Sequence, residues 1–219
     1  MRLRTFDAFL LLVHDDVSGR CLVSERRWQR TAAGVAILEL VEDGALALDL
    51  GSSRVHGTGR PPADPALASL LSHAAGARLV RAATTTEGLL PGMRGIVDDV
   101  LDARLGRLAQ AGLLSPRERR VLGIVVDVEW LPGARRDVEA ALRGRMLAAL
   151  RGQVPVDEEA GALLAILHPT GALPAIFPEV DRRLLIDEVG ALVARTWLAQ
   201  AMFALAREPG RTPYERGLL

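Results

Sequence analysis

The sequence predicts a mainly α-helical protein, a single globular domain with a few short β-strands or hairpins. Apolar side chains recur with helical spacing in several segments, most clearly over residues 94–111, whereas runs with strand character are few and short. No internal repeat and no low-complexity linker divides the chain, and 219 residues suffice for one substantial core.

The first part of the chain alternates apolar runs with turn signals. Residues 10–23 combine an apolar run, a turn at 15–19 and a short strand. Small and apolar residues at helical spacing predict a helix over 31–41, which stops before Gly44. The acid Glu39 within this helix needs a partner, because a buried unpaired carboxylate is costly.

The next elements follow from polarity and from a helix-start signal. Residues 45–50 alternate in polarity and predict a short strand, and a loop dense in Gly, Pro and Ser follows over 51–65. Asp64 is a suitable cap and Pro65 a suitable first residue for a helix that extends to Ala75.

The second half is expected to add mostly helices, each with apolar residues on one face or with an acidic cap at its start. In chain order, the expected elements are a helix over 94–111 ended by Gly112, a strand over 121–130, a helix over 138–150 capped by Asp137, a helix over 157–167 and a helix over 179–206. The last helix leaves the oligomeric state open, because its apolar face over 189–206 can be buried within one chain or between chains in a homo-oligomer.

Composition excludes some chemistry. The formal net charge is zero, which argues against the globally basic surface that nonspecific nucleic-acid binding uses. All 27 cationic side chains are Arg, as a GC-rich coding sequence favours. Without Lys, the chain has no Schiff-base or phosphate-loop lysine, and Arg or backbone amides must make every contact with an anion.

The composition and motifs predict a soluble cytoplasmic protein. Cys21 is the single cysteine, so no intrachain disulfide forms, and this fits a reducing compartment. Asp7 interrupts the apolar run near the N-terminus, and no small-residue cleavage site follows it. The longest apolar segment contains Arg195 and Gln200 and is short for a membrane span.

No catalytic residue, metal ligand or cofactor site is expected. The four histidines are scattered, and none has zinc-ligand spacing to another or to Cys21. The Gly-x-Ser-x-Gly and His-Glu-x-x-His motifs are absent. Acidic pairs such as Glu158 and Glu159 stand near helix starts, where carboxylates stabilise the helix dipole. We therefore expect a protein that is not an enzyme.

One cluster is a candidate anion site: Arg26, Arg27 and Arg30 surround Trp28. Guanidinium groups match phosphate oxygens, and an indole ring settles at a membrane interface. The competing interpretation, which is the more frequent outcome for such clusters, has Trp28 at the edge of the core and the arginines in solvent.

Several segments together resemble a known family. They are residues 10–13, 15–19, 32–46, 101–114, 121–128, 175–178 and 181–183. In this order and spacing the chain is similar to the Golgi phosphoprotein 3 family over residues 6–206, with 207–219 as a C-terminal tail. The family also occurs widely in bacteria, and we expect a bacterial member.

The resemblance implies a non-catalytic peripheral membrane protein of adaptor type. Eukaryotic members bind phosphatidylinositol 4-phosphate and act as adaptors for membrane enzymes. The implied partners are therefore an anionic phospholipid headgroup or the tail of a membrane protein, and the implied place is the cytoplasm or the inner face of the cell membrane.

The family's lipid-site residues do not carry over to this chain. That site uses a Trp, an Arg in the first core helix and two Arg three apart on a later helix. The corresponding positions here are Ser24, Ala33, Asp98 and Leu101. The later helix instead carries Arg94, Arg104 and Arg107, which leaves a rearranged anion site open.

The alternative function is a winged-helix module that binds nucleic acid. Residues 101–114 followed by a strand pair resemble a recognition helix and a wing. Against this, Asp98, Asp99 and Asp102 would repel phosphates, and Gln110 is the only amide there to read bases. Nucleic acid is therefore the less favoured partner, and nothing supports a third possibility, a small-molecule or catalytic site.

Overall fold

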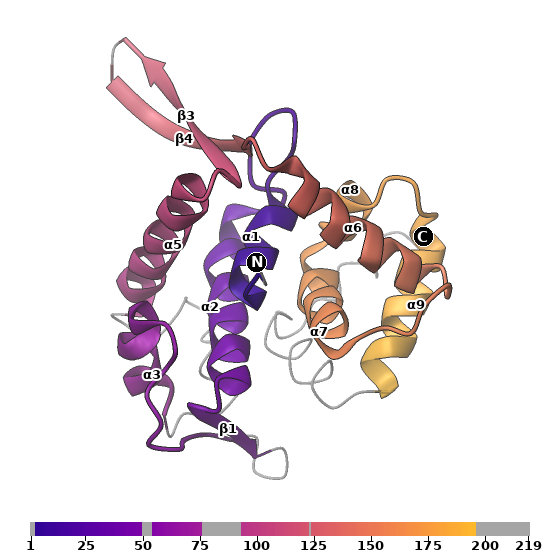
Figure 1. Cartoon of the computed structure of the whole chain (residues 1–219), viewed down its shortest axis with the longest axis horizontal. Helices are drawn as coiled ribbons and strands as arrows, with labels where there is room; N and C mark the ends of the chain where they lie inside the picture. The colour runs from indigo at the N-terminus through magenta and orange to yellow at the C-terminus, as the bar shows by residue number, and fades with distance from the viewer. Residues whose placement is uncertain (1–2, 50–53, 76–92, 123, 196–219) are drawn as a thin grey trace.

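The computed structural model describes residues 3–49, 54–75, 93–122 and 124–195 (Figure 1). The helices are α1 (Thr5–Val13), α2 (Glu25–Glu42), α3 (Ala68–Ala74), α5 (Met93–Gln110), α6 (Arg136–Leu150), α7 (Glu158–Leu167), α8 (Leu173–Ile176) and α9 (Arg182–Arg195). The strands are β1 (Leu46–Asp49), β2 (Arg54–Gly57), β3 (Leu114–Val121) and β4 (Ile124–Pro132), paired as two antiparallel hairpins. The predicted mainly α class is confirmed.

The two most apolar helices lie in the core. All of α1 is buried except Asp7, and α7 is buried from Ala160 to Leu167. A helix that is apolar on all sides requires neighbours on all sides. Accordingly α1 contacts α2, α5, α6 and α7, with α3 and α5 on one flank of the molecule and α6 to α9 on the other (Figure 1).

Several predicted helix starts are confirmed. The Asp64 carboxylate accepts a hydrogen bond from the Ala66 amide, and Pro65 begins a single 3-10 turn that leads into α3. The Asp157 carboxylate caps α7 through the Ala160 amide. The expected cap at Asp137 is wrong, because α6 begins at Arg136 and Asp137 lies within its first turn.

Three predicted boundaries are wrong. The helix expected over 31–41 begins at Glu25, since the preceding six residues contain neither Gly nor Pro. The loop expected over 51–65 contains β2, whose buried Val55 pairs with Leu48 of β1. The strand expected over 121–130 includes the last residue of β3, Val121, and most of β4, which begins at Ile124. Of the helix expected over 179–206, the structure describes Arg182–Arg195, and residues 196–219 lie outside the described part.

Glu39 has the partner that its burial requires. Its carboxylate is paired with Arg104 of α5 and with Arg4, whose Nε lies 2.7 Å away, and it accepts a hydrogen bond of 3.0 Å from the Phe6 amide. Arg104 is itself fully buried, and its guanidinium lies over the Phe6 ring, 5.5 Å from the centroid. This pair therefore joins α1, α2 and α5 through the core.

Two further acids complete this ion cluster. Arg104 lies 3.1 Å from Asp7 and 2.7 Å from Asp64, and Arg107 donates two hydrogen bonds to the same Asp64 carboxylate. Burial opposes ionisation of Asp64, but the hydrogen bond from Arg107 and the charge of Arg104 hold its pKa below the ordinary value. Arg104 and Arg107 are thus both paired with acids, which argues against an anion site at these two arginines.

Candidate functional site

The β3–β4 hairpin projects from the helical body (Figure 1). Its register runs from Leu114 opposite Pro132 at the root to Val121 opposite Ile124 at the tip, with one irregularity between Arg119 and Arg120. Along β3 only Leu114 is buried. The hairpin therefore contributes little to the core beyond its root.

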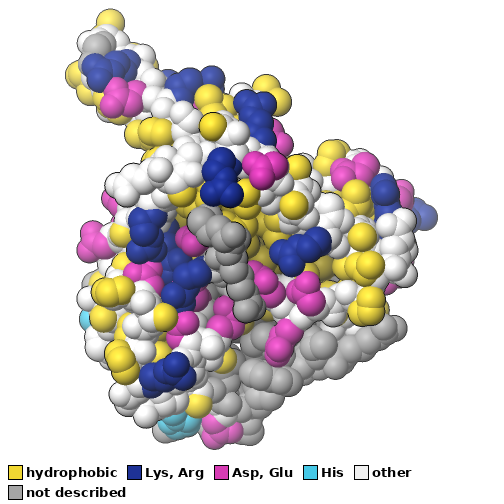
Figure 2. Space-filling model, in the orientation of Figure 1, with side chains coloured by type: hydrophobic (Ala, Val, Ile, Leu, Met, Phe, Trp, Pro, Cys, Tyr) yellow, Lys and Arg dark blue, Asp and Glu magenta, His cyan; other side chains and the backbone are white. Residues whose placement is uncertain are grey.

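The outer end of the hairpin is apolar. The large hydrophobic residues exposed in the described part of the chain are Val17, Val121, Leu122, Ile124, Val125, Val126, Val128, Val154 and Leu184, and six of these nine belong to the hairpin. Leu122 is 98% exposed and Ile124 is 69% exposed. Figure 2 shows hydrophobic side chains at the projecting end, together with Arg and acidic side chains. Large apolar side chains exposed together in one projecting element are typical of a contact with a membrane or a partner.

Leu122 at the tip has an unfavourable backbone conformation. Its φ is +51°, a left-handed conformation that Gly, Asn and Asp tolerate better than Leu. A turn between directly paired strands normally uses those residues. Leu122 thus destabilises the turn by about 1 kcal/mol and gains no burial within this protein. This combination indicates a role outside the fold.

The charges on the hairpin balance. Arg117 donates hydrogen bonds of 2.6 and 2.9 Å to Glu129, and these lower the pKa of Glu129. Arg120 pairs with Glu118, and Arg119 stands opposite Asp127 in the register. With three arginines and three acids, the hairpin offers apolar surface rather than a net positive charge.

The candidate cluster around Trp28 occupies the first two turns of α2. Trp28 stacks on Phe9 at 5.6 Å between ring centroids and meets His14 edge-on at 6.0 Å, so its ring packs against the core. Arg27 donates a hydrogen bond of 2.9 Å to the Thr170 carbonyl. The start of α2 lies at the end of the body from which the hairpin projects (Figure 1). Anion binding by Arg26, Arg27, Arg30 and Trp28 stays a prediction.

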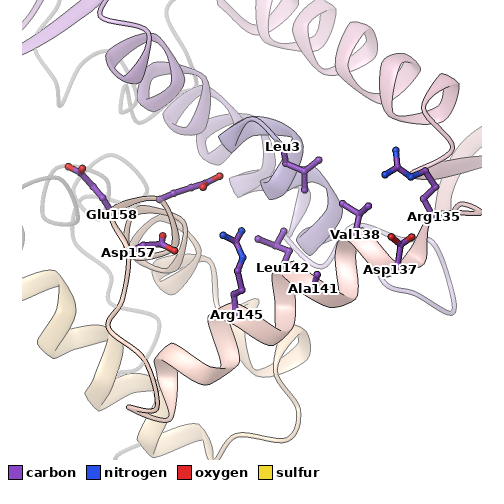
Figure 3. A pocket seen from close by; sticks show the side chains of 10 residues that line it. Leu3, Arg135, Asp137, Val138, Ala141, Leu142, Arg145, Asp157 and Glu158 are labelled. Carbon is purple, nitrogen blue, oxygen red and sulfur yellow. The ribbon is translucent and has the colours of Figure 1, made fainter. Parts of the chain in front are cut away.

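A groove of about 740 Å³ lies between α6, the start of α1 and the start of α7 (Figure 3). Leu3, Val138 and Leu142 are apolar residues of its lining. Arg145 points into it from α6, Asp157 and Glu158 stand at the α7 end, and Arg135 and Asp137 stand at the opposite end (Figure 3). Sequence periodicity did not reveal this groove, because its wall combines three segments distant in the chain.

The described part of the chain offers neither a metal site nor a membrane-spanning helix. No three side chains of His, Cys, Asp or Glu come together there as a metal ion would require. None of the described helices is both long and apolar enough to cross a membrane.

The helix-then-hairpin order expected of a winged helix is present in α5 and β3–β4. However, Asp98, Asp99 and Asp102 are all exposed on α5. Asp98 accepts a hydrogen bond of 3.0 Å from the Gln29 side chain, and the other two acids face solvent. An acidic helix face repels the phosphates of a nucleic acid.

No curated protein matches the chain. The family model described as Golgi phosphoprotein 3 (GPP34) matches residues 6–208, which is nearly the whole chain and closely agrees with the extent of the resemblance found in the sequence. The chain therefore belongs to the Golgi phosphoprotein 3 family.

Proposed function

We propose that this protein is a non-catalytic peripheral membrane protein and that the tip of the β3–β4 hairpin inserts into a bilayer. The observation that carries the proposal is the exposed apolar tip, in which Leu122 occupies an unfavourable turn conformation without burial in the protein. Family membership agrees with a membrane role. A narrow projecting tip suits insertion between lipid headgroups better than contact with a flat protein surface.

The size of the tip suits reversible binding. Burying a Leu or Ile side chain contributes about 1.5–3 kcal/mol. Leu122 and Ile124 together therefore favour a weak contact, which anionic headgroups strengthen where arginines lie nearby. Since the hairpin is charge-balanced, we assign that second contribution to the cluster at the start of α2.

Leu122→Asn tests the insertion. Asn tolerates the left-handed turn, so the hairpin remains folded while the tip loses its most exposed apolar side chain. We expect binding to vesicles of phosphatidylcholine with phosphatidylglycerol to fall about 10- to 150-fold in co-sedimentation, as burial of one Leu implies. Val154→Asn, which changes an exposed apolar residue in the α6–α7 connection, should bind like the wild type.

The same assay separates the two contributions. Arg26→Gln with Arg30→Gln should reduce only the extra binding that phosphatidylglycerol or phosphatidylinositol 4-phosphate adds over phosphatidylcholine alone. If the wild type binds no vesicle, or if Leu122→Asn binds as well as the wild type, insertion of the tip is wrong. In either case the tip would instead suit a pocket on a protein.

The groove along α6 supports a second, adaptor part of the function. Its apolar residues and the carboxylates of Asp157, Glu158 and Glu159 at one end complement an extended segment with apolar and basic side chains. A tail of a membrane protein with this chemistry would be within reach of a protein held at the bilayer.

Charge reversal tests the groove. We expect Glu158→Arg with Glu159→Arg to weaken binding of a fluorescent 12-residue peptide of alternating Leu and Arg about tenfold, because it replaces attraction by repulsion at partly screened sites. Glu188→Arg, on the exposed face of α9, is the control. Equal fluorescence anisotropy titrations for both variants would contradict a peptide site in the groove.

A further inference from the structure

Arg145 of α6 points into the groove between an apolar part and an acidic part of its lining. In the close-up it stands between Leu142 and Asp157, and Val138 follows beyond Leu142 toward the start of α6 (Figure 3). The Arg145 side chain is exposed, and it forms no ion pair or hydrogen bond with the residues that the structure describes. The groove thus contains a cation without a partner among those residues.

Arginines that hold the fold together have partners instead. Arg143, two residues earlier on α6, lies 2.8 Å from the buried Glu139 and donates a hydrogen bond of 3.0 Å to the Ile176 carbonyl. Arg104 and Arg107 are paired with acids on α2 and before α3. Arg145 has no such structural task, so its guanidinium is available to a ligand in the groove.

The charges at the two ends of the groove differ. At the α7 end stand three acids: Asp157 caps the helix, and Glu158 and Glu159 form no ion pair within the described part of the chain. At the opposite end Arg135 and Asp137 carry opposite charges. From the middle of α6 toward α7, the groove therefore presents apolar, then positive, then negative surface (Figure 3). A complementary ligand carries apolar, acidic and basic side chains in the same order.

The helix sets the spacing of these side chains. Val138, Leu142 and Arg145 all line the groove from α6. With a rise of about 1.5 Å per residue, Leu142 lies about 6 Å along the helix from Val138, and Arg145 lies about 10 Å from it. An extended chain advances about 3.3 Å per residue and turns every second side chain to the same side. Alternate residues of an extended segment therefore meet these three positions, and the long Arg145 side chain spans the small difference in length.

We propose that the groove binds an extended segment with an acidic residue between its apolar and its basic residues, and that Arg145 selects this acidic residue. A guanidinium and a carboxylate form charge-assisted hydrogen bonds. A segment with a basic residue at the same point would bring two cations together. The inference rests on the proposed function because it takes the groove as a peptide site, and it adds the requirement for an acid.

Two fluorescent peptides test the selection. One has the sequence Leu-Ser-Leu-Ser-Asp-Ser-Arg-Arg, and the other has Asn in place of Asp. Both are also made with the sequence reversed, because the groove specifies the order of the side chains and not the direction of the backbone. In fluorescence anisotropy titrations at low ionic strength, we expect the wild type to bind the Asp peptide about three- to tenfold more tightly than the Asn peptide in one of the two directions, as a partly exposed charge-assisted contact implies.

Substitution of Arg145 should change this preference and leave the rest of the groove intact. Arg145→Gln should bind the two peptides equally, and Arg145→Glu should bind the Asn peptide more tightly, because its carboxylate repels the Asp. Arg151→Gln is the matched control, since Arg151 is exposed at the end of α6 and does not line the groove. It should keep the wild-type preference.

The outcomes separate this inference from the peptide site itself. Equal binding of the Asp and Asn peptides by the wild type, or a preference that persists in Arg145→Gln, would overturn the selection by Arg145. Binding of the peptide of alternating Leu and Arg would in that case still support the groove as a peptide site. If the wild type binds none of these peptides, the peptide site and the selection both fail.

Discussion

Arg104→Met is expected to lower the free energy of unfolding by about 3–5 kcal/mol, the range found when one partner of a buried ion pair is removed. The substitution keeps most of the volume of the side chain but leaves Glu39, Asp7 and Asp64 without their shared cation. Glu39 and Asp64 are both buried and cannot recover hydration in place. Urea denaturation monitored by circular dichroism measures the loss.

Two variants make this prediction specific to the buried charge. Arg107→Met removes a cation that also binds Asp64 but is 46% exposed, so its cost should stay within about 1 kcal/mol. The double variant Arg104→Met with Glu39→Met should lower the free energy of unfolding by less than the sum of the two single changes. The reason is that the double variant no longer buries the Glu39 carboxylate without Arg104. Additive costs, or an Arg104→Met variant as stable as the wild type, would show that the cluster does not behave as a buried ion network.

The Glu39 cluster illustrates which part of the fold the sequence could predict. An acid at an apolar helix position required a partner, and the helix over 94–111 was evident from its periodicity. The identity of the partner was not, because Arg104 is 65 residues away in the chain. One signal was present: Arg104 lies between Leu101 and Leu108 on the apolar stripe, where an arginine is out of place unless it is buried with acids.

The hairpin illustrates where sequence reasoning fails. The apolar run over 121–130 predicts a strand, and nothing in the run itself shows that the strand is exposed. The strand is exposed because the hairpin extends beyond the helical body. The order of apolar and polar residues within the strand does not encode this extension. Residues 115–120 are polar and rich in arginine, and they could have identified the first strand of the hairpin. A strand with this many charged side chains does not lie in a core, so the apolar strand paired with it is exposed as well.

The cluster at the start of α2 lies between these cases. Its composition suggested an anion site, and no local pattern could show that Trp28 stacks on Phe9 or that Arg27 reaches the Thr170 carbonyl, 143 residues away. These contacts fix the positions of Trp28 and Arg27 at the hairpin end of the body. A membrane-facing role would thus rest on the placement of α2 as much as on the residue types.

Gly133→Ala is expected to destabilise the protein by about 3 kcal/mol, the upper part of the range for inserting an atom into a packed site. Gly133 connects β4 to α6 and lies against Gly112, which ends α5. A Cβ on Gly133 would overlap the Gly112 carbonyl group, and backbone atoms cannot rotate away as a side chain can. The Gly133 amide also donates a hydrogen bond of 2.9 Å to the Leu113 carbonyl, so displacement would break this contact as well.

Gly106→Ala is the matched control for this variant. Gly106 lies inside α5 in an ordinary helical conformation, and a Cβ added there would meet no atom within 4 Å, so the same chemical change should stabilise the helix by about 0.5–1 kcal/mol. Thermal unfolding should therefore shift in opposite directions for the two variants. The contact between Gly133 and Gly112 lies where the hairpin joins the body. Gly133→Ala should therefore also reduce vesicle binding at temperatures where the variant remains folded. If Gly133→Ala unfolds at the same temperature as the wild type, the backbones at Gly133 and Gly112 do not lie as close together as the predicted clash requires.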